Sequence, residues 1–567
     1  MQKPCLIGMV VGLSCLAHAQ TNFPPPPAPA GNPVTTEKTL LGMALFWEEQ
    51  LSSTGTVACG TCHDFGHGGV DARAGQRRHP GADNRPGTAD DVSGSPGVVR
   101  TGLDYTMGSP TFGLRPQVTA RRAPTVFNTG YHTHLFYDGR AERGDYRDPV
   151  TNQIVLTGPV ALENLIKGPP VNEVEMGHVG RSWPQVASRI AASEPLVLAS
   201  DLPPRLATFV GTHTYPELFA LAFGTPDVTP SRIVMAIATY LRTLNTDQTR
   251  FDRYLNNTVQ LTPDEAAGLQ LFTSPAQGAV KCSTCHGDFE PRVRQEGPVA
   301  GAMTQTFAGP YGAPNPTRLV FHNVGVRPAF EDPGRSAISS VAAEFGKFRT
   351  ASLRGVELTG PYFHNGSMAT LRDVIDFYDR GGDFGQNQSP GLTPRAYTTY
   401  QKDALEALLG TLTDPRVVAG TVPFDHPTLG SQNGKLPQPI GPGSAVGNGR
   451  ATATTPFAPL LGENSFSILL DGVSAGAFTL MMWDTALLPS GPDPGNFYFA
   501  LGTSPNFLVV PIGPAQDLYG QGTSRLRMPL PANPAFRGLR LYAQWLVIEP
   551  SVAWNLATSN ALGITLR

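Results

Sequence analysis

The sequence has little charge, few cysteines and no apolar run long enough to cross a membrane. Only 15% of the 567 residues are charged, and 42 basic against 45 acidic side chains leave a net charge of −3. So weak a charge favours neither nucleic acid nor an anionic membrane surface as a partner. The most apolar stretch, Leu6 to Leu16, is far shorter than the roughly 20 residues of a transmembrane helix. We therefore expect no nucleic-acid partner and no membrane span.

The first residues have the pattern of a secretory signal peptide. Lys3 precedes the apolar stretch, and Ala17-His18-Ala19 follows it as a small-x-small cleavage site. We expect residues 1–19 to be removed on export, which predicts a periplasmic or secreted protein. Export places the mature chain in an oxidising compartment, where cysteines normally form disulfides.

The six cysteines are distributed in a way that points to a different use. Cys5 and Cys15 belong to the signal peptide, and the other four lie in two Cys-x-x-Cys-His segments, 59–63 and 282–286. This is the c-type haem attachment pattern, in which two thiols form thioethers to one porphyrin and the adjacent histidine binds its iron. We therefore predict two covalently bound haem c groups. The attachment residues are Cys59, Cys62, Cys282 and Cys285, and the iron ligands are His63 and His286.

Three other uses of these cysteines are weighed against haem attachment. A zinc ribbon would place its two Cys-x-x-Cys units about 15–20 residues apart, whereas these segments are separated by most of the chain's first half. A thioredoxin-like site would need a βαβ surround, and Gly/Thr-rich loops with helical flanks are found instead. Disulfides within each segment would not explain a histidine directly after both.

Helical patterns precede both haem-attachment segments. Apolar residues repeat with helical spacing near 40–45, Thr229-Pro230 starts a second helix, and the capping box 262–265 starts a third. A last helix is expected at 403–412, stopped by Asp414-Pro415. Because one plan occurs twice, we predict a mainly α body of two cytochrome c-like haem domains.

The stretch 66–119 lies between the first haem segment and the helix expected to start at Thr229. It is too long for a plain connection and is a candidate functional segment.

The end of the chain changes character. Short apolar runs separated by turns occur at 466–470, 497–501, 507–510, 539–547 and 564–566. They predict an all-β sandwich without a haem motif, with Trp483, Trp545 and Trp554 in its core. The expected boundaries are a signal peptide at 1–19, a Pro-rich linker at 20–36, haem domains at 37–258 and 259–416, a linker at 417–450, and the sandwich at 451–567.

Residues 38–415 resemble the bacterial di-haem cytochrome c peroxidase and MauG family. The matching stretches are Leu41–Phe46, Arg122–Asn128, Phe136–Arg140, Val174–Met176, Phe251–Leu255 and Leu358–Gly366. The resemblance implies an enzyme that reduces hydrogen peroxide at the N-terminal haem, while the C-terminal haem stores or relays electrons. The electrons would come from a small cytochrome c or cupredoxin, or from an oxidisable substrate.

The resemblance also implies roles for residues of the first haem pocket. Glu175 matches the family's distal carboxylate, which moves a proton during peroxide cleavage; the alternative is an ordinary surface or capping glutamate. Tyr137 stands between the haems where the family usually has tryptophan, and Leu165 replaces a common glutamine. His79, which follows His63 at the spacing of a removable distal ligand, is either such an iron ligand or a solvated loop histidine.

The second haem and a calcium site distinguish branches of the family. Peroxidases place a methionine as the second haem's sixth ligand and the MauG branch a tyrosine, and the matching position here is Tyr378. The alternative is a buried core aromatic on the same helix face. Calcium would bind the carbonyls of Thr359 and Pro361, but Arg122 replaces an asparagine ligand and offers no oxygen. The acidic loop 83–91 is a second calcium candidate or simply a solvated turn.

Two other functions remain open from the sequence. One is a non-enzymatic di-haem electron carrier in which both irons are six-coordinate. The other is a MauG-like oxidase or oxygenase that acts on a protein or an organic substrate. Within the family, the MauG-like branch is favoured by Tyr378.

Overall fold

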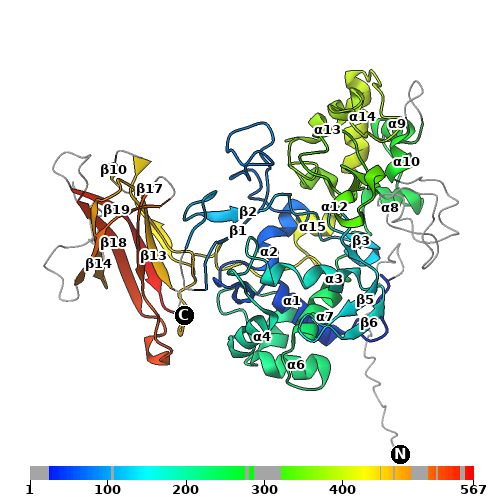
Figure 1. Ribbon diagram of the computed structural model, residues 1–567. Coiled ribbons are helices and arrows are strands. Elements are labelled where there is room, and N and C mark those ends of the chain that lie inside the picture. Colours follow the sequence, from blue (N-terminus) through cyan, green and yellow to red (C-terminus); the bar gives the residue numbers. More distant parts are fainter. Residues whose placement is uncertain are drawn as a thin grey trace, which may run out of the picture.

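The computed structural model describes residues 25–103, 107–274, 280–286, 321–442, 444–446, 449–463, 466–486, 508–518, 521–548 and 556–567. The expected signal peptide, the expected strand at 497–501 and Trp554 lie outside these ranges. Figure 1 shows two groups of helices and a separate β-rich part. No helix in the described ranges is long and apolar enough to span a membrane.

The first helical region is built around the packing of its first and last helices. Its helices are α1 (Thr36–Phe46), α2 (Cys59–Cys62), α3 (Ala161–Ile166), α4 (Trp183–Ala192), α5 (Pro204–Val210), α6 (Tyr215–Phe223) and α7 (Pro230–Leu241). As expected, Thr229 caps α7 and accepts a hydrogen bond from the Arg232 N–H. Gly42 of α1 lies against α7 so closely that a Cβ would be 2.0 Å from the Ala236 carbonyl oxygen. Only glycine permits this approach of the two helices.

The second helical region repeats that arrangement. It contains α8 (Arg250–Leu255), α9 (Pro263–Thr273), α10 (Cys282–His286), α12 (Ser336–Ser339), α13 (Leu371–Asp379) and α14 (Thr399–Gly410). Gly268 of α9 lies against α14, where a Cβ would be 2.0 Å from the Ala404 carbonyl oxygen. Helix α14 begins before the expected residue 403 because Thr398 and Gln401 form a capping box. In both regions, therefore, the helix that precedes a Cys-x-x-Cys-His segment uses a glycine to pack on a later helix.

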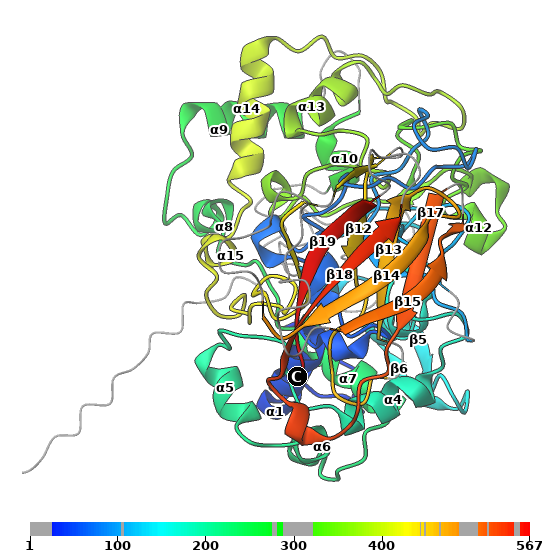
Figure 2. The ribbon, with the colours of Figure 1, turned by 90° about the vertical axis from the view of Figure 1, so that its left-hand side faces the viewer.

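The two larger antiparallel sheets of the β-rich part share one core. One sheet has the order β12 (Thr452–Thr454), β13 (Ser467–Val473), β17 (Gln521–Arg527), β16 (Gln516–Leu518). The other has the order β15 (Leu508–Pro514), β14 (Phe478–Asp484), β18 (Arg540–Ile548), β19 (Leu556–Thr565), β9 (Gln438–Ile440), and most of it faces the viewer in Figure 2. Ile468, Trp483 and Trp545 belong to the shared core, which confirms the expectation for these two tryptophans.

Both segments expected to be linkers pack against the first helical region. In the Pro-rich segment, Asn32 is fully buried and its amide donates to the Met235 carbonyl at 3.0 Å. In the segment 417–450, Phe424 lies in the helical core, and the Gly430 N–H donates to Glu49 at 2.7 Å. Strand β9 lies in the same segment. These stretches fold because side chains and neighbouring strands satisfy their backbone groups, which proline and glycine content alone does not reveal.

Candidate active site

Two cavities adjoin the two Cys-x-x-Cys-His segments. The first, of about 700 Å³, is lined by Cys59, Cys62 and His63. The second, of about 420 Å³, is lined by Cys282, Cys285 and His286, which form α10 with two intervening residues. The cysteines and histidine predicted for each haem are thus gathered at one cavity.

Both predicted iron-binding histidines are half-buried, and their surroundings favour the neutral form. The Nδ1 atom of His63 lies 3.1 Å from the Gly69 carbonyl oxygen. Because a carbonyl only accepts, Nδ1 carries the proton and Nε2 keeps a free lone pair, as a metal ligand requires. Burial lowers the pKa of His63, and burial together with His322 lowers that of His286 to about 4.

The four thiols are free and poorly suited to redox chemistry of their own. No disulfide joins any of them in the part of the chain that the structure describes. Burial raises the pKa of Cys59 to about 12 and that of Cys285 to about 11. A thioredoxin-like cysteine has the opposite property, a depressed pKa in an electropositive setting. Half-buried thiols at a cavity, with raised pKa values, fit attachment of a prosthetic group better than disulfide exchange.

Glu175 faces the first cavity together with His63. It lies in the loop after the 3₁₀ turn Pro169–Val171, and its N–H donates to the Asn172 side chain at 3.2 Å. Burial raises the pKa of its carboxyl, an effect that Arg140 partly offsets. The other acids differ, because Glu163 is paired with buried Arg242 at 2.8 Å and Glu173 is exposed.

His79 and Leu165 line the same cavity, so the structure brings the candidate distal histidine to the first pocket. Its backbone pairs with Val92 in both directions, at 2.9 and 2.8 Å. Its Nδ1 accepts a hydrogen bond from the Gly81 N–H at 3.2 Å. A neutral ring that accepts at Nδ1 carries its proton on Nε2, so iron ligation through Nε2 would require the other tautomer and loss of this bond. Ligation by His79 stays a prediction.

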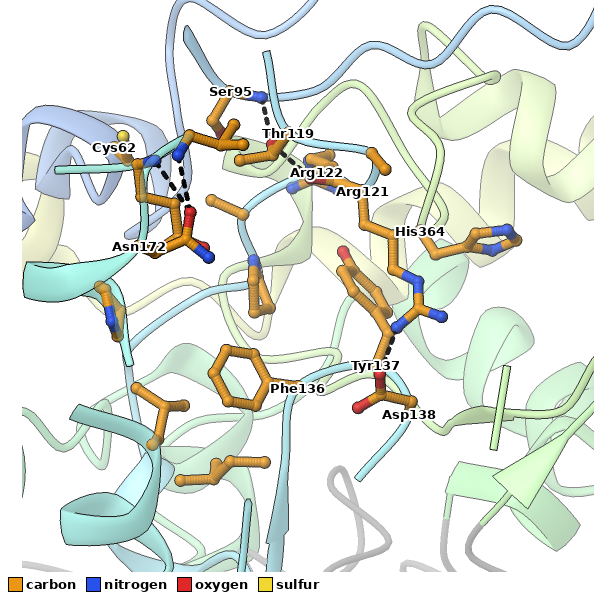
Figure 3. Close-up of a pocket in the computed structure, with 18 of the residues that line it drawn as sticks. Cys62, Ser95, Thr119, Arg121, Arg122, Phe136, Tyr137, Asp138, Asn172 and His364 are labelled. Atoms are coloured by element: carbon orange, nitrogen blue, oxygen red, sulfur yellow. Dashed lines mark hydrogen bonds and ion pairs between the residues drawn. The ribbon is translucent and has the colours of Figure 1, made fainter. Parts of the chain in front are cut away.

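The two cavities share part of their lining, which we call the common wall. Figure 3 shows the first cavity, with Arg122, Tyr137 and His364 of this wall labelled. The residues that line both are Arg122, Tyr137, Arg327, Asp332, Arg349 and His364. Tyr137 therefore lines both cavities, and its role between two haems stays a prediction. His364 has its ring centroid 6.3 Å from that of Tyr137 and 3.8 Å from that of Phe348, and burial lowers its pKa to about 4. Sequence reasoning passed over His364, although it lies inside one of the matching stretches.

Two arginines of this wall are buried without a carboxylate partner. The neighbouring Arg121 does have such partners, because it pairs with Asp138 and Asp332, both at 2.6 Å. Arg122 and Arg349, in contrast, form no ion pair with any residue in the described ranges, and the buried Nε of Arg122 has no hydrogen-bond partner. Burial lowers the pKa of Arg122 and that of Arg349 to about 10.

A buried charge without a partner destabilises a protein. An anionic group bound in either cavity would stabilise the two arginines of this wall. A haem carries two acidic propionate groups, and the residues present therefore fit haem in both cavities. The same positive charge disfavours a further cation. Arg122 lines the second cavity together with Thr359, which argues against calcium there. Calcium at Thr359 and Pro361 stays a prediction that this environment does not support.

Tyr378 lines the second cavity on the side of α13, together with His286. Its neighbour Phe377 is fully buried in the protein interior and so fills the core position of this helix. Burial and the nearby Cys285 and Cys282 thiols raise the pKa of Tyr378. Met368 is not among the residues that line this cavity. Tyr378 thus lies at the cavity wall, and its role as an iron ligand stays a prediction.

Two cavities, each lined by two cysteines and a histidine on a helical scaffold, fit the class of haem oxidoreductases. Residues 36–260 match the profile of the di-haem cytochrome c peroxidase family. This part of the chain therefore belongs to the di-haem cytochrome c peroxidase family, and the similarity supports an enzyme of that class.

The similar proteins include both cytochrome c peroxidases and MauG proteins. The cytochrome-c peroxidase IdrP1 of Pseudomonas sp. (strain SCT) is 27% identical over 444 residues, which cover 74% of this chain and 90% of that protein. The methylamine utilization protein MauG of Methylorubrum extorquens is 28% identical over 391 residues, 68% of this chain and 81% of that one. A solved MauG-like protein associated with microbial copper homeostasis has 26% identity, a TM-score of 0.48, and coverage of 71% of this chain and 97% of its own.

Proposed function

We propose that this protein is an exported di-haem c-type peroxidase that reduces hydrogen peroxide to water at the first cavity. The observation that carries the proposal is Glu175, a carboxylate that faces the same cavity as His63 and its two attachment cysteines. The first haem would be held by Cys59, Cys62 and His63, and the second by Cys282, Cys285, His286 and Tyr378. The two helical regions would then be the two haem domains.

The overall reaction consumes one peroxide, two electrons and two protons and releases two water molecules. Bound haem supplies the iron that exchanges electrons with peroxide. Glu175 takes a proton from one peroxide oxygen and returns it to the oxygen that leaves as water. A carboxyl with a raised pKa suits both steps, because general acid–base catalysis is most efficient when the pKa lies near the working pH.

The wall between the cavities provides the path for the second electron. Tyr137 lines both cavities, and an aromatic side chain at this position shortens the distance that an electron must cross between the pockets. The second cavity would store or relay electrons that arrive from a small cytochrome c, a cupredoxin or an oxidisable substrate. Steady-state turnover with a panel of reduced donors would identify which of these the protein uses.

A charge-neutralising substitution in the wall should affect both haems. In Arg349→Gln we expect the midpoint potentials of both haems to fall, because a nearby positive charge favours the more negative ferrous state. Arg395→Gln is the matched control, since Arg395 is equally buried but lines only the second cavity. It should lower only the second potential. Spectroelectrochemical titration measures both potentials. Unchanged potentials in Arg349→Gln would show that the wall does not influence the two haems.

The test of the function is stopped-flow addition of hydrogen peroxide to the purified holoprotein. We expect rapid changes in the absorption of both haems, first at the high-spin haem of the N-terminal half. Electron paramagnetic resonance beforehand should show one high-spin and one low-spin haem. Two low-spin haems that never react with peroxide would instead indicate an electron carrier, and the peroxidase proposal would be abandoned.

A further inference from the structure

A β-hairpin in the long segment 66–119 lies between the β-rich part and the first cavity. Its strands are β1 (Pro96–Val99) and β2 (Pro116–Val118), which pair antiparallel. Figure 1 shows them between the sheets and the first helical region. We call residues 96–103 and 107–118 the hairpin, and it contacts both neighbours.

On its inner side the hairpin holds the backbone that precedes Glu175. The Val98 N–H donates to the Val174 carbonyl at 3.3 Å, and the Gln117 side-chain amide donates to the Glu173 carbonyl at 2.6 Å. Gly97 permits this contact, because a Cβ there would lie 1.9 Å from the Val174 carbonyl oxygen. The position of the Glu175 carboxylate therefore depends on where the hairpin lies.

The hairpin also reaches the attachment cysteines of the first cavity. The Arg73 guanidinium donates to the Pro96 carbonyl at 2.8 Å and lies 3.3 Å from the Cys62 sulfur. Its charge is balanced by buried Asp71 at 2.9 Å. A shift of the hairpin would thus move groups on two sides of the pocket, near Glu175 and near Cys62.

On its outer side the hairpin is part of the core of the β-rich part. Val99, Met107 and Leu114 are buried in the same apolar cluster as the sheet residues Leu470 and Trp545. Burial of these three apolar side chains removes their surface from water and so binds the hairpin to the sheets. An ion pair between Arg115 and Asp471 at 3.8 Å lies at the edge of this contact.

We propose that the C-terminal β-rich part is a positioning element for the first cavity. It holds the hairpin from outside, the hairpin holds residues 173 and 174, and these place the Glu175 carboxylate against the pocket. No residue of the β-rich part that the structure describes lines the first cavity, so its proposed effect is on the geometry of that pocket. This inference rests on the role proposed above for Glu175.

The test uses the full-length holoprotein and weakens each of the hairpin's two contacts in turn, the one with the sheets and the one with residues 173 and 174. Leu114→Asp places a charge in the shared core and should detach the hairpin from the sheets. Gln117→Met keeps the side-chain volume but removes the donor to Glu173, so the sheets stay attached. We expect both variants to slow the reaction of the first haem with peroxide roughly ten- to a hundredfold, as misplaced catalytic groups do. Both should also change its spin state and cyanide affinity, with the second haem unaffected.

Glu463→Gln is the control, because it removes a contact of the β-rich part with α4, the 3.1 Å ion pair to Arg189, outside the hairpin. It should leave the first haem unchanged. If Leu114→Asp does not fold, Gln117→Met decides alone. Normal spin state, cyanide affinity and peroxide rate in the folded variants would overturn the inference. If the parent protein does not react with peroxide, the proposed function is wrong. The spin state and cyanide affinity of the first haem in the variants would still show whether the hairpin determines the geometry of the pocket.

Discussion

Replacing Glu175 with glutamine should slow the reaction of the first haem with hydrogen peroxide by about 10²–10⁴-fold, the usual contribution of a positioned acid–base group. Glutamine has nearly the same shape, but it can neither accept the peroxide proton nor deliver one to the leaving oxygen. Stopped-flow absorption measures the second-order rate constant. Glu173→Gln is the matched control, because Glu173 is exposed and its side chain does not line the cavity.

The pH dependence provides a second measure of the same group. Burial raises the pKa of Glu175, and only the deprotonated carboxylate can take the first proton. The rate in the parent protein should therefore fall as the pH is lowered through this raised pKa, at a pH above the range of an ordinary glutamate. Glu175→Gln should lose this dependence. A full rate in Glu175→Gln, or an unaltered acid limb, would assign proton transfer to another group.

Replacing Tyr378 with methionine should raise the reduction potential of the second haem on the order of 0.1 V, since axial ligands set haem potentials over a range of about 0.8 V. A phenolate oxygen stabilises ferric iron, whereas a thioether sulfur favours the ferrous state. Burial holds the free phenol protonated, so binding to iron would displace that proton. Spectroelectrochemistry and the ligand-to-metal absorption bands report the change.

Tyr397→Phe is the control for this second substitution. Tyr397 lines the same cavity but follows α13 rather than lying on it, and removing its hydroxyl should leave the ligand bands in place. If Tyr378→Met has the spectrum and potential of the parent protein, Tyr378 is not a ligand and the MauG-like reading of the second haem is wrong.

The haem-attachment residues could be read from the sequence because their chemistry is local. A Cys-x-x-Cys-His segment needs only five consecutive residues to offer two thiols and an imidazole to one porphyrin, and the short helices at 59–62 and 282–286 present them as expected. Helix starts were equally accessible, since a capping threonine and the following residues act within one turn. Glu175 and Tyr378 came from resemblance to a family rather than from local chemistry.

The wall between the cavities and the attachment of the β-rich part depend on contacts between distant residues. Arg122 and Arg349 are more than two hundred residues apart, and nothing near either one in the sequence indicates that both are buried without a carboxylate. The same holds for the hairpin, whose Leu114 shares a core with Trp545. By itself, then, the sequence predicted two haem sites and determined the helices before them, because covalent spacing and capping act locally. Only the tertiary structure decided which charges face the cavities and what holds Glu175, because burial and unpaired charge are properties of the assembled chain.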